Sequence, residues 1–410
     1  MLALLAFNLV HIALCICDIK VHDKSITPYA IIAAAYVALV DMDNLVFSKL
    51  YPLRMVSAST MWMVSCFLFL AFLIDISWGL LIRHFAKKDV MRQIDRPIAK
   101  NDRQISYVIY ILFFIGVLSF LGAYLRCLMV YGYHDTKGHM GGILAHIAML
   151  GFILGPVALK RALDTKKRPM AVLIILMSLL ELMIAILFGG KYLIFINLTY
   201  YLMYFQLLRE KKLSLTRMVI LFLCIALLAF TVFGLVYLLF PVLLGGESPN
   251  LNLVMDRLTY YLFSSLIACD DAFAMPSFGD STFPFAVPIN IYRAITSSAP
   301  YVEPLFERVF EAAYAGRMVN VSGLFGEAVY CLGYGLGTIY IGAYFALIGL
   351  LGFCYKRFGS MYISYTYMCA ITVFMFFSNF MILSGVVYPL ALAILVDIGK
   401  ELISRRPVIG

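Results

Sequence analysis

The chain alternates long apolar segments with short polar ones. The apolar segments lie at about 1–17, 27–46, 60–82, 106–132, 141–159, 169–188, 191–208, 218–244, 325–353, 361–378 and 381–399. Crossing a bilayer takes about 20 apolar residues in a helix but only about 10 in a barrel strand. Within lipid, a helix also satisfies every backbone hydrogen bond internally. The pattern therefore predicts an all-α, polytopic integral membrane protein with about eleven transmembrane helices.

Composition agrees with this prediction and excludes a soluble domain. Of the 410 residues, 63% are hydrophobic and 13% are charged, whereas soluble domains are roughly half apolar and a quarter charged. The net charge of +9 does not indicate a nucleic-acid partner, because the basic residues lie in short segments between spans. The nine cysteines form no CxxC pattern. No metal site is predicted from their spacing.

The basic segments predict the orientation of the chain. They are 83–104, 160–168, 209–217, Lys356-Arg357, and the residues Lys400, Arg405 and Arg406 after the last span. With eleven spans, all five segments fall on the same side of the membrane. The positive-inside rule makes that side cytoplasmic. We therefore expect the N-terminus outside and the C-terminus inside.

One extramembrane segment is long, and it falls on the outer side. We predict three parts: a bundle of about eight helices at 1–244, an outer loop at 245–324, and a bundle of about three helices at 325–410. Apolar positions at helical spacing predict amphipathic loop helices at 252–268 and 304–315. The prolines of 281–300 predict irregular chain there.

Charged residues within spans are costly and usually have a partner or a function. They are Asp41, Asp43, Asp75, Arg126, His146, Glu181, Lys191 and Glu327. For Asp75, nearer the inner face, we expect an N-cap-like or snorkelling role. Arg126 fits snorkelling or anion binding equally. His146 is expected to be a packed core residue rather than a metal ligand, and the Gly151–Gly155 pair predicts close helix packing.

The long loop adds further charges on the same side as most of the charged span residues. These are Arg257, Arg293, Arg308 and Arg317, with Asp270, Asp271 and Asp280. Arginine forks and lysine ammonium groups suit phosphate oxygens. The basic groups therefore predict an anion site at the outer membrane surface, and a lipid pyrophosphate is an anion at that depth. The sequence contains no P-loop, GxSxG, HExxH or GxGxxG motif ahead of a helix.

A family resemblance enters at residues 320–335, which read NVSGLFGEAVYCLGYG before an apolar span. This resembles the segment after the large periplasmic loop of bacterial O-antigen and capsule repeat-unit polymerases, which often carry Gly-Glu-x-x-Tyr-x-x-x-Gly. Gly326, Glu327 and Tyr330 match, with Gly333 and Gly335 near the last position. Gly189-Gly190-Lys191 is similar to the family's Gly-x-Arg turn, with Lys in place of Arg. The segment DRLTYYLFSSLIACDDAF resembles its amphipathic entry helix.

The resemblance implies a GT-C-like membrane glycosyltransferase in the bacterial inner membrane, with a periplasmic N-terminus and a cytoplasmic C-terminus. It would join undecaprenyl-pyrophosphate-linked oligosaccharide units into O-antigen or a similar polysaccharide at the periplasmic face. It would work without a metal or other cofactor. The implied partners are this lipid-linked substrate, membrane lipids and a chain-length regulator, but no nucleic acid.

The resemblance also implies residue roles. The candidates for the catalytic base are Glu327, Asp270 and Asp271. The candidates for binding pyrophosphate or saccharide are Arg126, Lys191, Arg257, Tyr260, Tyr261, Arg293, Arg317 and Tyr330. Two alternatives remain open: an O-antigen ligase, whose acceptor is lipid A core, and a transporter or flippase of lipid-linked sugars. A transporter predicts related halves and charges near the bilayer centre, which the sequence does not display.

Overall fold

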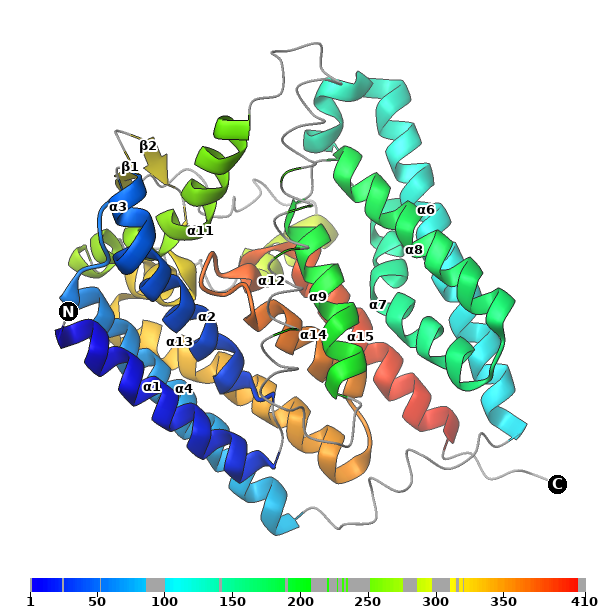
Figure 1. Ribbon diagram of the computed structural model, residues 1–410. Coiled ribbons are helices and arrows are strands. Elements are labelled where there is room, and N and C mark those ends of the chain that lie inside the picture. The colour runs from blue at the N-terminus through cyan, green and yellow to red at the C-terminus, as the bar shows by residue number, and fades with distance from the viewer. Residues whose placement is uncertain are drawn as a thin grey trace. The chain divides into compact units, whose positions relative to one another are not determined.

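The structure is a computed structural model, and its helices are long (Figure 1). It describes residues 2–23, 26–51, 53–85, 100–139, 142–188, 191–207, 220, 227, 231, 234, 251–275, 286–296, 310–314, 317–319 and 321–404. Its longer helices are α1 (Leu2–His22), α2 (Pro28–Met42), α4 (Ala58–Phe85), α6 (Lys100–His139), α7 (Ile143–Asp164), α8 (Arg168–Phe188), α9 (Lys191–Leu207), α11 (Leu251–Ala274), α12 (Ala286–Thr296), α13 (Gly323–Phe358), α14 (Tyr362–Thr372) and α15 (Ser384–Ser404). Short elements complete them: η1 (Asp43–Phe47), α3 (Ser48–Leu50), η3 (Phe380–Ile382), β1 (Phe310–Tyr314) and β2 (Arg317–Val319).

Within the described residues, seven helical stretches are long and apolar enough to cross a membrane. They are Leu2–His22, Pro28–Leu50, Ala58–Phe85, Gln104–Gly132, Ile143–Asp164, Arg168–Leu187 and Gly323–Phe358. The prediction of a helical, multi-pass membrane protein is confirmed in this coarse form. The predicted span at 218–244 lies almost entirely outside the described residues, and the count of eleven stays a prediction.

The chain forms two compact units, and each draws on three separate parts of the sequence. Unit 1 contains Met1–Phe85, Lys212–Leu350 and Ile371–Ser384. Unit 2 contains Ala86–Lys211, Leu351–Ala370 and Gly385–Gly410. The predicted division into three parts has its boundaries at the ends of the predicted outer loop, near residues 244 and 324. It describes the sequence order and stays a prediction.

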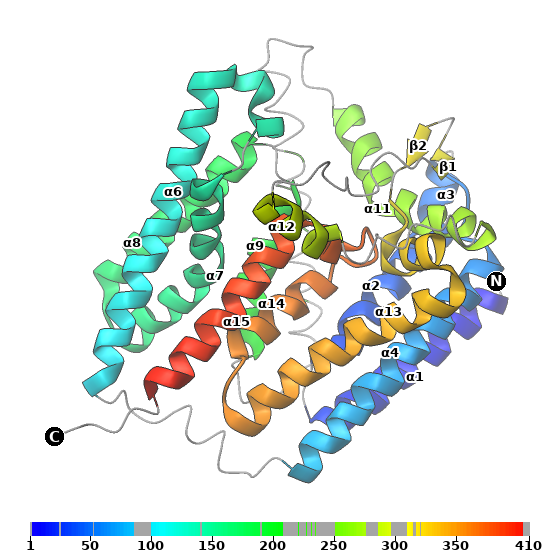
Figure 2. The same cartoon turned by 180° about the vertical axis from the view of Figure 1, so that it is seen from behind.

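In unit 1, helices α1, α2 and α4 pack together, and α13 lies along α4 (Figure 2). Aromatic rings join the start of α13 to this group. Tyr36 of α2 stacks on Phe325 with ring centroids 5.1 Å apart, and Phe67 of α4 stacks on the same ring at 5.4 Å. All three rings are buried. The start of α13 is therefore fixed against α2 and α4.

Two glycines determine the path of α13. Gly323, at its start, has φ +68°, and a Cβ there would lie 2.5 Å from the carbonyl oxygen of Phe376. Gly333 has φ 70° and ψ 174°, which breaks the helix into a short first part and a long second part. Both conformations are in the region that favours glycine. These glycines belong to the segment that carries the family resemblance.

The predicted span at 361–378 is helical only over its first part. Helix α14 ends at Thr372, and turns followed by η3 occupy the chain up to α15. Eleven residues of helix reach only about 16 Å, which is too short to cross a bilayer alone. Irregular backbone at membrane depth is tolerated where protein buries it. Ser378, Asn379 and Phe380 are indeed buried.

The predicted outer loop also differs from expectation in part. The helix expected at 252–268 is confirmed as α11 and extends to Ala274. Helix α12 occupies part of 281–300, where irregular chain was expected. The helix predicted at 304–315 is wrong over its second half, where β1 pairs antiparallel with β2. The backbone N–H and C=O groups of β1 therefore pair with those of β2, which begins after two intervening residues, instead of pairing within a helical turn.

In unit 2, glycines allow α6, α7 and α9 to approach closely. A Cβ on Gly116 of α6 would collide with the backbone of Gly151 of α7, and one on Gly155 would collide with the hydroxyl of Tyr201. Small residues allow such close packing between membrane helices. The expected packing role of Gly151 and Gly155 is confirmed.

Asp397 of α15 accepts hydrogen bonds from the backbone N–H groups of Ile363 and Ser364, so it caps the start of α14.

Candidate functional site

Asp270 and Asp271 of α11 meet the segment that leads into α4. The Oδ1 atom of Asp270 accepts hydrogen bonds from Ser57 Oγ at 2.5 Å and from Thr60 Oγ1. Arg54 Nη2 donates to Asp271 Oδ1 at 3.1 Å and lies 3.7 Å from Asp270 Oδ2. We call these five residues the Arg54 cluster. It places one cation and two carboxylates at the Ser57 end of α4.

The Arg54 cluster is partly open. The Arg54 side chain is 48% exposed, whereas those of Asp270 and Asp271 are 14% and 18% exposed. A second bond, from Arg54 Nη2 to the carbonyl oxygen of Ile267 at 3.3 Å, fixes the guanidinium over α11. The arginine therefore faces the surroundings while the carboxylates lie beneath it.

Burial raises the pKa of Asp270 above its ordinary value. The neighbouring charge of Asp271 acts in the same direction, while the hydrogen bond from Ser57 and the charge of Arg54 oppose it. A carboxylate with a raised pKa is a stronger base than an ordinary aspartate and is common at catalytic sites. Of the two predicted loop carboxylates, Asp270 is therefore the better placed to accept a proton.

Glu327, the third predicted base, lies near the start of α13 and is buried. Its Oε1 accepts from Ser378 Oγ at 3.1 Å and from the backbone N–H of Ser322 at 3.4 Å. Its Oε2 accepts from the backbone N–H of Asn379 at 3.0 Å. Three donors hold this carboxylate and join two irregular stretches of backbone. The geometry favours an anchoring role for Glu327 over the role of base.

A tightly packed junction connects Asp270 to Glu327. Cys269, next to Asp270, donates from Sγ to the carbonyl oxygen of Ser322 at 2.8 Å. A Cβ on Gly326, next to Glu327, would lie 3.1 Å from that sulfur and 2.8 Å from Ser322 Cβ. Only glycine fits here without displacement. The anchor made by Glu327 therefore helps to set the position of α11 and its aspartates.

Two predicted sugar-binding tyrosines lie near this junction. Tyr260 of α11 and Tyr330 of α13 are partly buried, and both pack against the cluster of Ala268, Ala272 and Val321. The structure therefore brings Tyr260, Tyr330, Asp270 and Glu327 into one region of unit 1. Tyr261 lies on α11 as well, but its side chain is outside the described residues.

The predicted basic ligands are distributed over both units. Arg126 lies on α6 in unit 2 and is exposed. Lys191 begins α9 in the same unit. Arg257, Arg293 and Arg317 lie on α11, α12 and β2 of unit 1. The side chains of these last four residues are outside the described part of the chain, so their role in binding an anion stays a prediction.

The structure also places Asp75, Glu181 and His146, three of the other charged span residues. Asp75 accepts from the backbone N–H of Tyr29 at 2.8 Å in the first turn of α2, which confirms an N-cap-like role, supplied from another helix. It is buried, so the snorkelling alternative is wrong. Glu181 is buried against Gly151. His146 is exposed and contacts Tyr388 edge-on, so the expected core packing of His146 is wrong.

Sequence reasoning missed Arg54, Ser57 and Thr60. Arg54 and Asp271 are 217 positions apart, and no spacing pattern links them. One signal was present: Arg54 lies in a short segment on the predicted outer side, where the positive-inside rule expects few basic residues. A cation retained on that side would have been a reasonable candidate for a functional group.

Comparisons of the chain with protein-family models, with curated proteins and with solved structures find no match.

Proposed function

We propose that the protein is a membrane-embedded glycosyltransferase that polymerises lipid-pyrophosphate-linked oligosaccharide units into O-antigen or a similar surface polysaccharide. The proposal includes the eleven-span, GT-C-like arrangement and the periplasmic face of the bacterial inner membrane as its place. The observation that carries it is the Arg54 cluster. There, an exposed arginine from the segment before α4 lies beside a carboxylate of raised pKa on α11, the helix of the long loop.

The position of the cluster supports this assignment. The Arg54 cluster lies at the start of α4, whereas Arg83 lies in the last turn of that helix and the rest of the basic segment follows it. The positive-inside rule makes the Arg83 end cytoplasmic. The Arg54 cluster then lies at the outer face, where the pyrophosphate of a lipid-linked glycan would be.

The chemistry needs a base and an anion-stabilising group. The Asp270 carboxylate would take the proton of the acceptor hydroxyl, and the hydroxyl oxygen would attack the anomeric carbon of the donor sugar. The bond between that carbon and the pyrophosphate oxygen breaks, and the electron pair leaves with the lipid pyrophosphate. Arg54 would stabilise the negative charge that develops there. The sugar–pyrophosphate bond is already activated, so no nucleotide is required.

Other groups have supporting roles in this proposal. Glu327 would act as a positioning residue through the Cys269–Ser322 junction, and Asp271 would orient Arg54. Tyr260 and Tyr330 would contact sugar rings. The other proposed ligands of the pyrophosphate or the saccharide are Arg126, Lys191, Tyr261, Arg257, Arg293 and Arg317.

A residue-level assay tests the proposal. Purified protein would be mixed with a lipid-pyrophosphate-linked repeat unit, without nucleotide or added metal, and the products separated on a gel. We expect a ladder from the wild type and none from Asp270→Asn. The control is Asp164→Asn, which alters a carboxylate that is 47% exposed on α7. A full ladder from Asp270→Asn would contradict the assigned base.

The same assay addresses the alternatives. If lipid A core is the only acceptor used, each acceptor gains one donor glycan and no ladder appears, which is the result for a ligase. If the lipid-linked unit only changes leaflet in proteoliposomes and no bond is made, the protein is a flippase. Either result would overturn the polymerase assignment.

A further inference from the structure

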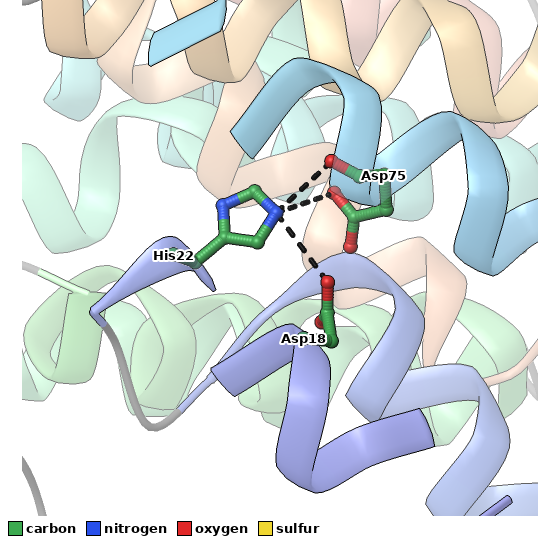
Figure 3. Close-up of side chains that lie close together, drawn as sticks. All are labelled: Asp18, His22 and Asp75. Carbon is green, nitrogen blue, oxygen red and sulfur yellow. Dashed lines mark hydrogen bonds and ion pairs between the residues drawn. The ribbon is translucent and has the colours of Figure 1, made fainter. Parts of the chain in front are cut away.

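A second polar cluster lies in unit 1, about five helical turns along α4 from Ser57. Asp18 and His22 come from α1, and Asp75 comes from α4 (Figure 3). His22 Nε2 lies 3.5 Å from Asp18 Oδ1, 3.3 Å from Asp75 Oδ1 and 3.0 Å from the carbonyl oxygen of Asp75. One nitrogen and two carboxylate oxygens thus converge within 4.8 Å of one another.

The outward oxygen of each carboxylate is held by another donor. Thr27 Oγ1 donates to Asp18 Oδ2, and the backbone N–H of Tyr29 donates to Asp75 Oδ2 at 2.8 Å. Thr27 in turn caps α2 through the N–H of Ala30. These bonds turn the Oδ1 atom of each aspartate toward His22. Outer hydrogen bonds of this kind orient the ligands of protein metal sites.

Gly79 makes room for the imidazole. It lies one turn after Asp75 on α4, and a Cβ there would be 2.8 Å from His22 Nε2 and 3.0 Å from Cε1. A larger residue would push the ring away from both aspartates. The position of the nitrogen is therefore built into the packing of α1 on α4.

The cluster is also shielded from solvent. The side chains of Asp18, His22 and Asp75 are 0%, 5% and 4% exposed. Ionisable groups within membrane helices usually pair with one another or mark a functional site. A divalent ion would neutralise the two carboxylates, and a mixed imidazole–carboxylate set suits Zn²⁺ and Mn²⁺.

We propose that Asp18, His22 and Asp75 form a binding site for a divalent transition-metal ion, which joins α1 to α4. His22 Nε2 and one Oδ1 from each aspartate are the ligands, and the carbonyl oxygen of Asp75 lies close enough to contribute a fourth. Binding requires an unprotonated Nε2, so the imidazole proton then sits on Nδ1. The sequence predicted no metal site, because Asp75 is 53 residues from His22.

The test measures the metal directly. The full chain in detergent would be treated with a chelator, equilibrated with Zn²⁺, desalted and analysed for zinc by mass spectrometry. We expect one ion per chain in the wild type and background levels in His22→Gln and Asp75→Asn. The control is His84→Gln, which alters an exposed histidine of α4, the helix that carries Asp75. A wild type without zinc, or variants that retain the full amount, would overturn the site.

A wild-type measurement covers the case in which the variants fail to fold. Co²⁺ would replace Zn²⁺, and its visible absorption bands report nitrogen and oxygen ligands. We expect bands that saturate at one equivalent and disappear when Zn²⁺ is added. Absence of Co²⁺ bands in folded wild type would rule the site out. Because neither readout uses glycan transfer, the result is independent of the proposed polymerase activity.

Discussion

The carboxylate of Glu327 accepts a hydrogen bond from the backbone N–H of Asn379 at 3.0 Å. This bond joins two regions that are far apart in the sequence: the Gly-Glu segment at the start of α13 and the irregular chain between α14 and α15. Ser378 donates to the same carboxylate. Irregular backbone between helices needs hydrogen-bond partners inside the protein. The Glu327 carboxylate supplies acceptors for the N–H groups of Ser322 and Asn379, which gives this residue a structural reason to be an acid.

Glu327→Gln should lower stability without changing the shape of the side chain. The amide offers one acceptor oxygen in place of two, so a donor among Ser322, Ser378 and Asn379 loses its partner. An unsatisfied buried donor costs about 1–3 kcal/mol. Thermal unfolding in detergent should show a lower Tm, with Asp164→Asn as an unaffected control. An unchanged Tm would mean that Glu327 does not hold this backbone.

Gly323→Ala should be destabilising, whereas Gly335→Ala in the same segment should not. Gly323 has a positive φ, and its added methyl group would meet the carbonyl of Phe376. The site around Gly335 is open to 4 Å. Alanine at a position with positive φ costs more than about 1 kcal/mol. The fraction that survives heating, measured by size exclusion, checks the difference. Equal survival of the two variants would contradict the described path of α13.

Arg54→Ala should reduce glycan polymerisation while the protein remains inserted. The variant removes the exposed cation that we assign to the departing pyrophosphate. Losing a single electrostatic group at a transition state costs on the order of 10²-fold in rate. Initial rates of polymer formation measure the effect, and Arg168→Ala, at an exposed arginine of α8, is the matched control. Wild-type rates for Arg54→Ala would remove the arginine from the mechanism.

Polymerisation should be lost as the pH falls, with a midpoint above the ordinary aspartate value of about 3.9. Burial raises the pKa of Asp270, and a base works only in its unprotonated form, so a raised pKa moves the acid limb to higher pH. Ser57→Ala removes a hydrogen bond that lowers this pKa and should move the limb further upward. Ser77→Ala, at an exposed serine of α4, should leave it in place. A downward shift in Ser57→Ala would exclude Asp270 as the titrating base.

The hydrophobic pattern predicted most of the helices but not where α14 ends. The residues after Thr372 are Val373, Phe374, Met375, Phe376 and Phe377, which read as more span. The helix stops at Thr372 because tertiary hydrogen bonds compete with helical ones. The carbonyl oxygen of Met375 accepts from the N–H of Leu324, and that of Phe377 accepts from the N–H of Gly323. Such long-range partners leave no periodic signal.

The candidate site was predictable only in part, for a similar reason. Asp270 and Asp271 stand out as adjacent carboxylates in the long loop, and the sequence identified them. Their partner Arg54 comes from the segment before α4, and the Asp75 partner of His22 comes from α4 itself, so both are distant in sequence. Only packing brings such pairs together, so a single sequence indicates the charged residues without indicating which ones meet.

The most direct test of the central claim is reconstitution of the wild-type protein with a panel of lipid-pyrophosphate-linked repeat units, including the unit made by its own host. The readout is release of free lipid pyrophosphate together with glycan length. The proposal predicts a ladder of glycans, with one lipid pyrophosphate released for each unit added. Release of no lipid pyrophosphate and no lengthening with any unit, from protein that is folded and inserted, would contradict it.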